Sequence, residues 1–314
     1  MTKRPGVGYT AYPKRMSTSE PRPPKLIAAF RALRVKQWPK NGALLFPLLF
    51  ARMLDQGRLI NAALAVISFS LLASGVYVLN DWFDREKDRL HPEKRKRPIA
   101  AGHLDGFGAF AVVCVCWATA LGLGWRLGVP YLEVLGGYLA LQVLYTGWLK
   151  QLVILDVMAI ALGFILRVIA GAVAIDVVVS NWLFLCTLFL AVFLGFAKRR
   201  AELSSLEDNA TAHRANLADY TVPMLDQMMS ISAASTILAY GLYTVSKETV
   251  DHVGSDRLKY TVPVVVYGVF RYLFLVHKRG AGGAPEKVLL SDRPLQADIV
   301  VFLGLAAWAL YFKG

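Results

Sequence analysis

The chain has 314 residues, of which 56% are hydrophobic and 18% charged, and its formal net charge is +13. A soluble domain of this length carries more charge than that. The apolar residues recur in runs of roughly 18 to 25, which is the length that spans a bilayer. The composition therefore excludes an ordinary soluble protein. The absence of a basic helix interleaved with aromatic residues also argues against a nucleic-acid partner.

The first 27 residues are basic and rich in proline, and they lack the apolar centre of a signal peptide. Such a segment cannot bury enough apolar surface to fold by itself. We therefore predict a disordered cytoplasmic arm at residues 1–27, followed by a single membrane domain at residues 28–314.

Nine apolar spans follow the arm. They are 42–54, 60–80, 105–124, 130–148, 152–175, 181–198, 222–246, 260–277 and 297–312. The first span is short, and we expect it to extend back through the amphipathic stretch LIAAFRALRVKQWPKN. Of the 35 lysines and arginines, 26 lie in the segments that share a side with the N-terminus, and seven lie on the opposite side. Because basic residues collect in cytoplasmic loops, we predict a cytoplasmic N-terminus and an external C-terminus.

The second span ends in NDWFDREKDRLHPEKRKRP, residues 80–98. On one continuous helix, Asn80, Asp81, Asp84 and Asp88 fall within a single 100° arc. Three carboxylates so close together repel one another unless they share a cation. Hard oxygen ligands of this kind suit Mg²⁺, which binds through a few carboxylates plus substrate phosphates. The alternative is a solvated helix end that carries scattered charges.

The basic run that follows, Lys94–Arg97, has two interpretations. It is either an anchor against anionic lipid on the cytoplasmic side, or a set of cations that close over a phosphate held by the metal. Because Arg97 is fixed beside Pro98, it is the best candidate for the second role.

Other charged residues lie at or inside the apolar spans. Lys36, Lys40 and Asn41 stand where the first span enters the membrane, and the lysines either bind a lipid phosphate or snorkel to the interface. Asp156 lies near a cytoplasmic helix end and Arg167 lies deeper. Three turns separate them, so we expect Arg167 to bind backbone carbonyls or another helix. Asp292 and Arg293 predict a surface ion pair.

Lys198 and Glu202 share one helix face, and Arg199 adjoins Lys198. They form either a binding pocket for phosphate or an ordinary ion pair between residues four apart, which contributes a few tenths of a kcal/mol.

The stretch NDWFDREKDRLHPEKRKRPIAAG resembles the first aspartate-rich motif, N-D-x-x-D-x-x-x-D, of the UbiA superfamily of intramembrane prenyltransferases. The position of this motif after the second of nine spans also matches. The segments LYTGWLK, with Tyr145 and Lys150, and LDVMAIALGFILRVIAG resemble the fourth and fifth helices of the family. The resemblance implies an all-α integral membrane protein. Its nine transmembrane helices would surround a cavity that opens to lipid, with a polar cap on the cytoplasmic side.

One departure from the family is informative. Most members carry a second motif, D-x-x-x-D, after the sixth helix, where this chain has Lys198 and Glu202. A second metal cluster is therefore in doubt. This variant, together with RVKQWPKN, LADYTVPMLDQMM and PEKVLLSDRPL, resembles the branch that transfers 5-phosphoribose from phosphoribosyl diphosphate (PRPP) to a polyprenyl phosphate. That branch implies Mg²⁺, a bacterial plasma membrane, and a product used for lipid-linked arabinose and cell-wall polysaccharide.

We expect the metal to be held by Asn80 and the three aspartates, which act as the catalytic residues. The expected substrate contacts come from Lys36, Lys40, Asn41, Arg97, Tyr145, Lys150, Asp156, Lys198, Arg199 and Glu202. Two rival functions stay open, an aromatic prenyltransferase that uses a prenyl diphosphate and a transporter of polyprenyl lipid. The sequence neither requires nor excludes a homo-oligomer.

Overall fold

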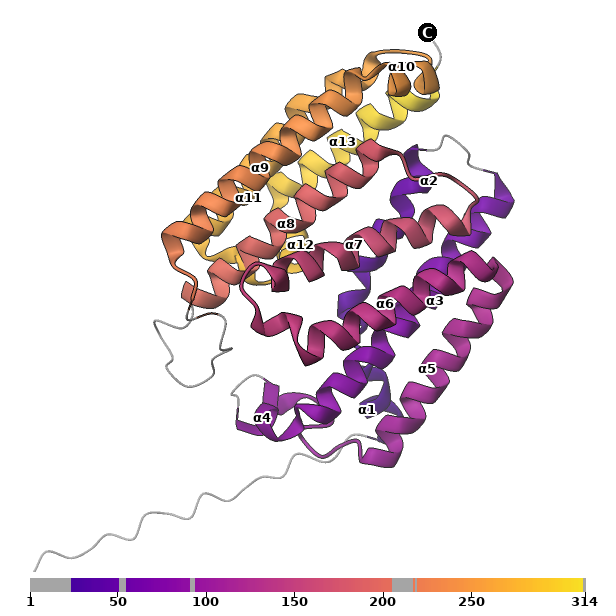
Figure 1. The fold of residues 1–314 in the computed structure, drawn as a ribbon, viewed down its shortest axis with the longest axis vertical. Coiled ribbons are helices and arrows are strands. Elements are labelled where there is room, and N and C mark those ends of the chain that lie inside the picture. The colour runs from indigo at the N-terminus through magenta and orange to yellow at the C-terminus, as the bar shows by residue number, and fades with distance from the viewer. Residues whose placement is uncertain (1–23, 51–54, 91–93, 205–216, 218, 313–314) are drawn as a thin grey trace, which may run out of the picture.

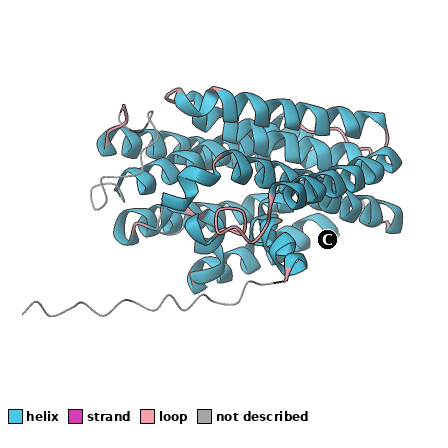
Figure 2. Ribbon diagram, turned by 90° about the horizontal axis from the view of Figure 1, so that it is seen from below, coloured by secondary structure: helices cyan, strands magenta, loops and turns pink. Residues whose placement is uncertain are grey.

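The structure is a computed structural model that describes residues 24–50, 55–90, 94–204, 217 and 219–312. These residues form helices joined by short turns, with no strand among them (Figure 2). Most of the predicted N-terminal arm lies outside the described residues, so its disorder stays a prediction.

Eight long helices account for most of the described chain. They are α3 (Gln56–Phe83), α5 (Gly106–Leu127), α6 (Val129–Gly147), α7 (Leu155–Ala174), α8 (Asn181–Ser204), α9 (Val222–Val245), α11 (Val262–Arg279) and α13 (Arg293–Tyr311). Each starts within four residues of a predicted span. Several starts are fixed by a side chain that accepts a hydrogen bond from the first helical turn, as Asp105 does from Gly108 N–H and Asp292 from Leu295 N–H. The predicted all-α class is confirmed.

Shorter helices join the long ones. They are α1 (Lys25–Ala32), α2 (Phe46–Phe50), α4 (Arg85–Leu90), α10 (Lys247–Val253) and α12 (Pro285–Ser291), with 3₁₀ turns η1 (Val35–Leu45), η2 (Lys94–Lys96), η3 (Leu149–Gln151), η5 (Arg257–Thr261) and η6 (Ala281–Gly283).

The first predicted span differs from expectation. The chain does not continue from LIAAFRAL into one amphipathic helix, because Arg34 adopts left-handed backbone angles (φ 51°, ψ 48°) and separates α1 from η1. Pro39 lies inside η1 and favours its 3₁₀ form over a regular α-helix. The last residues of this span, 51–54, lie outside the described residues.

Seven helices of the described chain are long and apolar enough to cross a membrane: α3, α5, α7, α8, α9, α11 together with the preceding η5, and α13. The remaining long helix, α6, has 19 residues and carries Glu133 and Gln142. The chain is therefore a multi-pass membrane protein by its helices, while the count of nine crossings stays a prediction.

The helices pack side by side as one bundle (Figure 1). One buried cluster joins α3, α5, α6 and α7 around Phe69 and Tyr138, and another joins α8, α9 and α11 around Phe193 and Met229. η1 packs closely on α7, because a Cβ on Gly171 would lie 2.0 Å from the carbonyl oxygen of Leu44. The ends of α3, α6 and α8 and the starts of α7 and α9 all lie at the end of the bundle nearest α4 (Figure 1). We call this the α4 end, and the predicted site residues concentrate there.

Candidate active site

A first polar cluster, made of Arg34, Asp81, Asp88 and Arg97, lies where α3 gives way to α4. Arg34 donates to both oxygens of Asp81, with Nε 3.2 Å from Oδ2. Arg97 Nη1 donates to Asp81 Oδ1 at 3.0 Å and to Asp88 Oδ2 at 2.6 Å. The two carboxyl side chains are only 4% and 5% exposed. Such buried carboxylates need cationic partners, and the arginines supply them.

The predicted continuous helix is interrupted inside the motif. α3 ends at Phe83 and Asp84 has φ −89° and ψ 3°, although Asp84 N–H still reaches Asn80 O and Asp88 N–H still reaches Asp84 O, both at 2.9 Å. Asp81 and Asp88 therefore face one side, as the helical arc predicts. Asp84 is half-buried, and in the described residues Arg34 and Arg97 form their ion pairs with Asp81 and Asp88, not with Asp84.

The donor set fits a divalent cation in its chemistry, because one chain segment supplies carboxylate and amide oxygens. The structure also shows that two of these carboxylates can share one cation, because a single nitrogen of Arg97 bridges Asp81 and Asp88. In this arrangement the guanidiniums take the cation's place. No group of three or more acidic, histidine or cysteine side chains in the described residues is close enough to hold a metal. The Mg²⁺ site stays a prediction.

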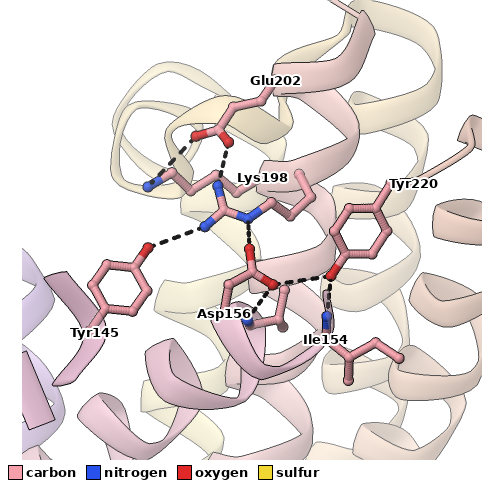
Figure 3. A network of polar contacts seen from close by, with 8 residues as sticks. Tyr145, Ile154, Asp156, Lys198, Glu202 and Tyr220 are labelled. Carbon is pink, nitrogen blue, oxygen red and sulfur yellow. Dashed lines mark hydrogen bonds and ion pairs between the residues drawn. The ribbon is translucent and has the colours of Figure 1, made fainter. Parts of the chain in front are cut away.

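A second polar cluster lies at the same end of the bundle, between α6, α7 and α8 (Figure 3). Its centre is Arg199, whose side chain is 0% exposed and whose Nε lies 2.6 Å from Asp156 Oδ2. Arg199 also donates to Glu202 and, at 3.3 Å, to the hydroxyl of Tyr145. Lys198 Nζ lies 4.0 Å from the other oxygen of Glu202. The structure thus brings together five of the ten predicted substrate contacts, Tyr145, Asp156, Lys198, Arg199 and Glu202.

Arg199 and Lys198 differ in exposure, and this difference indicates different roles. Arg199 is enclosed by Asp156, Glu202 and Tyr145, so its donors are used inside the protein. Lys198 is 35% exposed and is the basic residue of this cluster that solvent reaches. The neighbouring Arg200 turns away to Asp226 of α9.

Tyr220 belongs to the second cluster; it lies in the stretch LADYTVPMLDQMM but was not among the predicted site residues. Its hydroxyl accepts from Ile154 N–H at 2.6 Å and donates to Asp156 Oδ1 at 3.0 Å. Burial raises the pKa of Tyr220 to about 12, so the hydroxyl keeps its proton. Ile154 has φ 69° and ψ −47°, and Leu155 N–H reaches back to Val153 O at 2.8 Å, which makes a strained γ-turn directly before Asp156.

The last turn of α6 contacts the second cluster and Asn80, the neighbour of Asp81 in the first cluster. The Tyr145 hydroxyl accepts from Arg199, and the next residue, Thr146, donates to Asn80 Oδ1 at 3.4 Å. Asn80 is the first residue of the aspartate motif. The two clusters therefore border one region at the α4 end, and Thr146 is a further contact that the sequence did not reveal.

Asn41 and Arg167 form a third, buried network. Arg167 donates to Asn41 Oδ1 at 2.8 Å, to Gly163 O at 2.7 Å and to the Tyr138 hydroxyl at 3.2 Å. Asn41 in turn donates to Ser70 at 2.8 Å. The expectation that Arg167 binds a backbone carbonyl and another helix is confirmed. Asn41 is 2% exposed and uses its amide inside the protein, so we remove it from the proposed substrate contacts.

The remaining predicted substrate contacts are three lysines that lie on 3₁₀ turns. Lys36 is exposed and Lys40 half-buried, both on η1, and Lys150 is half-buried on η3. The expected surface pair between Asp292 and Arg293 is wrong. Asp292 is buried and accepts two hydrogen bonds from Arg271 instead, at 3.1 and 2.8 Å.

Known proteins are similar to this chain in sequence and in fold. A model of the UbiA prenyltransferase family matches residues 44–291. The decaprenyl-phosphate phosphoribosyltransferase of Mycolicibacterium smegmatis is 32% identical over 306 residues, covering 93% of this chain and 95% of the relative. The enzyme of the same name from Corynebacterium glutamicum is 35% identical over 299 residues, covering 92% and 89%.

The solved structure of a UbiA homologue from Archaeoglobus fulgidus, bound to DMAPP and Mg²⁺, superposes with a TM-score of 0.67. The match covers 91% of this chain and 100% of the homologue at 17% sequence identity. At this identity the likeness concerns the fold.

Proposed function

Because the chain belongs to the UbiA prenyltransferase family, we propose that it transfers 5-phosphoribose from PRPP to a polyprenyl phosphate and releases diphosphate. The observation that carries the proposal is the match to decaprenyl-phosphate phosphoribosyltransferases at 32% and 35% identity across about nine-tenths of the chain. We take decaprenyl phosphate as the first lipid to test. The product would serve as a lipid-linked donor for arabinose and cell-wall polysaccharide.

The charges of the site suit a reaction between two phosphorylated substrates. The C1–O bond to diphosphate breaks, and an oxygen of the lipid phosphate forms the new bond to C1. The lipid phosphate is already anionic, so no strong general base is required. Cations have to bring the anions together, and positioning supplies much of the acceleration. Arg34, Arg97 and Lys198 are half-buried cations at the α4 end of the bundle.

The first cluster would hold the leaving diphosphate. Asn80, Asp81, Asp84 and Asp88 would bind Mg²⁺, which when bound neutralises the charge that develops on the departing diphosphate. The Archaeoglobus homologue binds Mg²⁺ together with a diphosphate ester, which supports this assignment. Arg97 would then donate to phosphate oxygens.

The second cluster would receive the ribose 5-phosphate part of PRPP. Lys198 would donate to a phosphate, and Glu202 would accept hydrogen bonds from ribose hydroxyls. Arg199, Asp156 and Tyr145 would position Glu202 without touching the substrate.

The seven apolar helices support a membrane location. The excess of lysine and arginine on the N-terminal side supports a site that faces the cytoplasm of a bacterial inner membrane.

A three-way assay tests the proposal. The full chain, purified in detergent, is given Mg²⁺ with labelled PRPP and decaprenyl phosphate, and in parallel labelled DMAPP with 4-hydroxybenzoate. We expect a labelled lipid in the first reaction only. Product in the second reaction alone would replace the proposal with an aromatic prenyltransferase, and product in neither would favour a polyprenyl-lipid transporter.

A further inference from the structure

We propose that Arg34 is a diphosphate-binding residue that competes with the metal for Asp81. Its guanidinium would hold the carboxylate in the substrate-free protein and move to phosphate oxygens when Mg²⁺ and diphosphate bind. The inference rests on the metal–diphosphate part of the proposed function and is independent of the group that the diphosphate carries.

The first argument is that Asp81 already has its full complement of cations. Arg34 contacts both of its oxygens, and Arg97 shares one of them. Mg²⁺ added to this carboxylate while both guanidiniums remain would be the third cation to contact Asp81. Their mutual repulsion disfavours metal binding unless a guanidinium leaves or further negative charge arrives. A diphosphate supplies that charge.

The second argument concerns which arginine leaves. Arg97 bridges Asp81 and Asp88, so its departure would strip cations from two buried carboxylates. The departure of Arg34 removes one of two cations from Asp81 alone. The Arg34 side chain is 27% exposed, so solvent reaches it, and its guanidinium carbon lies 5.4 Å from the ring centre of Tyr77. Arg34 is therefore the easier of the two to exchange.

The third argument is the chemistry of the guanidinium group. The fork that binds both oxygens of Asp81 has the geometry that binds two oxygens of a phosphate. When an arginine moves from a carboxylate to a phosphate, two hydrogen bonds to phosphate oxygens can therefore replace its two hydrogen bonds to the carboxylate.

The backbone at Arg34 also points to a functional constraint. Left-handed backbone angles are strained for a residue that has a Cβ. Residues kept in such conformations cluster at functional sites. Here the conformation directs the chain from α1 into η1 with Arg34 against Asp81.

The test compares two binding measurements on the full chain in detergent. Calorimetric titration is performed with Mg²⁺ alone, and then with inorganic diphosphate at saturating Mg²⁺. For Arg34→Gln we expect Mg²⁺ alone to bind about tenfold more tightly, because its competitor is gone. Diphosphate should bind about tenfold more weakly, because a charge-assisted contact is lost. Arg31→Gln is the matched control, an exposed arginine of α1 that should change neither affinity.

The opposite signs of the two changes exclude a general loss of structure. Arg34→Lys keeps the charge without the fork, so it should stay close to the native Mg²⁺ affinity while losing part of the diphosphate affinity. If Arg34→Gln does not fold, Arg34→Lys alone still tests the loss of diphosphate affinity. An unchanged or weaker affinity for Mg²⁺ in Arg34→Gln would overturn the competition, and an unchanged diphosphate affinity would overturn the phosphate contact.

The outcome is separable from that of the proposed function. The opposite changes could be observed in a protein that does not turn over PRPP, which would reject the substrate and keep the exchange. Turnover of PRPP without the opposite changes would reject the exchange alone.

Discussion

Both polar clusters pair arginines with buried aspartates, but the arginines differ in how far they reach solvent. In the first cluster, Arg34 and Arg97 are 27% and 29% exposed and hold buried aspartates from the outside. In the second, Arg199 is fully buried. A cation that borders open space can exchange its partner for a ligand, while an enclosed one fixes its neighbours. The comparison separates residues that would bind substrate from residues that frame the site.

The largest expected effect is on turnover in the first cluster. Asp84 lies outside the arginine contacts of the described residues, so Asp84→Asn should leave the fold intact. It should also remove a metal ligand, and we expect product formation from PRPP to fall by about 1,000-fold. Glu86→Gln, two residues away on the exposed face of α4, is the matched control and should keep activity. Retained activity in Asp84→Asn would remove the metal assignment.

The next effect is on stability in the second cluster. Arg199→Gln leaves Asp156 buried without its cation, and breaking a buried pair in this way costs about 3–5 kcal/mol. The double change Asp156→Asn with Arg199→Gln removes both charges and should recover part of the loss. Denaturation in mixed micelles measures both. A double variant that is less stable than the single one would contradict the enclosed pairing.

A smaller effect is expected at Lys198, the exposed cation of the second cluster. Lys198→Ala should raise KM for PRPP by about tenfold and leave the melting temperature unchanged, since the side chain is one-third exposed. Lys198→Arg should restore most of the affinity. A drop in melting temperature without a change in KM would show that Lys198 stabilises the site and does not bind PRPP.

The smallest effect lies outside both clusters, at the start of α13. The hydrogen bonds from Arg271 hold the pKa of Asp292 below its usual value of about 3.9. A lowered folded-state pKa gives a stabilisation that is complete above the unfolded pKa and is lost as the pH falls through the folded pKa. The melting temperature should therefore fall below about pH 4, and this fall should be shallower in Asp292→Asn. Identical pH profiles for the two proteins would contradict the assignment.

The sequence predicted the long helices well because apolar runs of membrane length are bounded by charged turns. It also placed Asp156 near a cytoplasmic helix end and among the substrate contacts, but it did not show that Arg199 would join Asp156 to Glu202. What it missed depends on contacts between distant residues. Arg34 and Asp81 are 47 positions apart, and Tyr220 and Asp156 are 64 apart. No local pattern marks such pairs.

Two errors had local causes. The expected pair at Asp292 and Arg293 considered only neighbours in sequence, whereas Arg271 arrives from α11. The expected continuous entry helix ignored what Pro39 and the turn at Arg34 do to the backbone. Helical periodicity alone does not show where a helix breaks.

The close contact between Gly171 and Leu44 fixes the C-terminal end of η1 against α7. No side chain fits between η1 and α7 at that point, and the bond from Arg167 to Asn41 fastens the segment one turn earlier. Arg34 stands just beyond the opposite end of η1. Sliding of the whole segment is blocked, so a release of Asp81 has to occur through rotation of the Arg34 side chain or of the turn beside it. The N-terminal helix α1, on the far side of that turn, is also held in place, because Ala32 is buried against α3 and α5 and the Leu33 carbonyl accepts a hydrogen bond from Ser74.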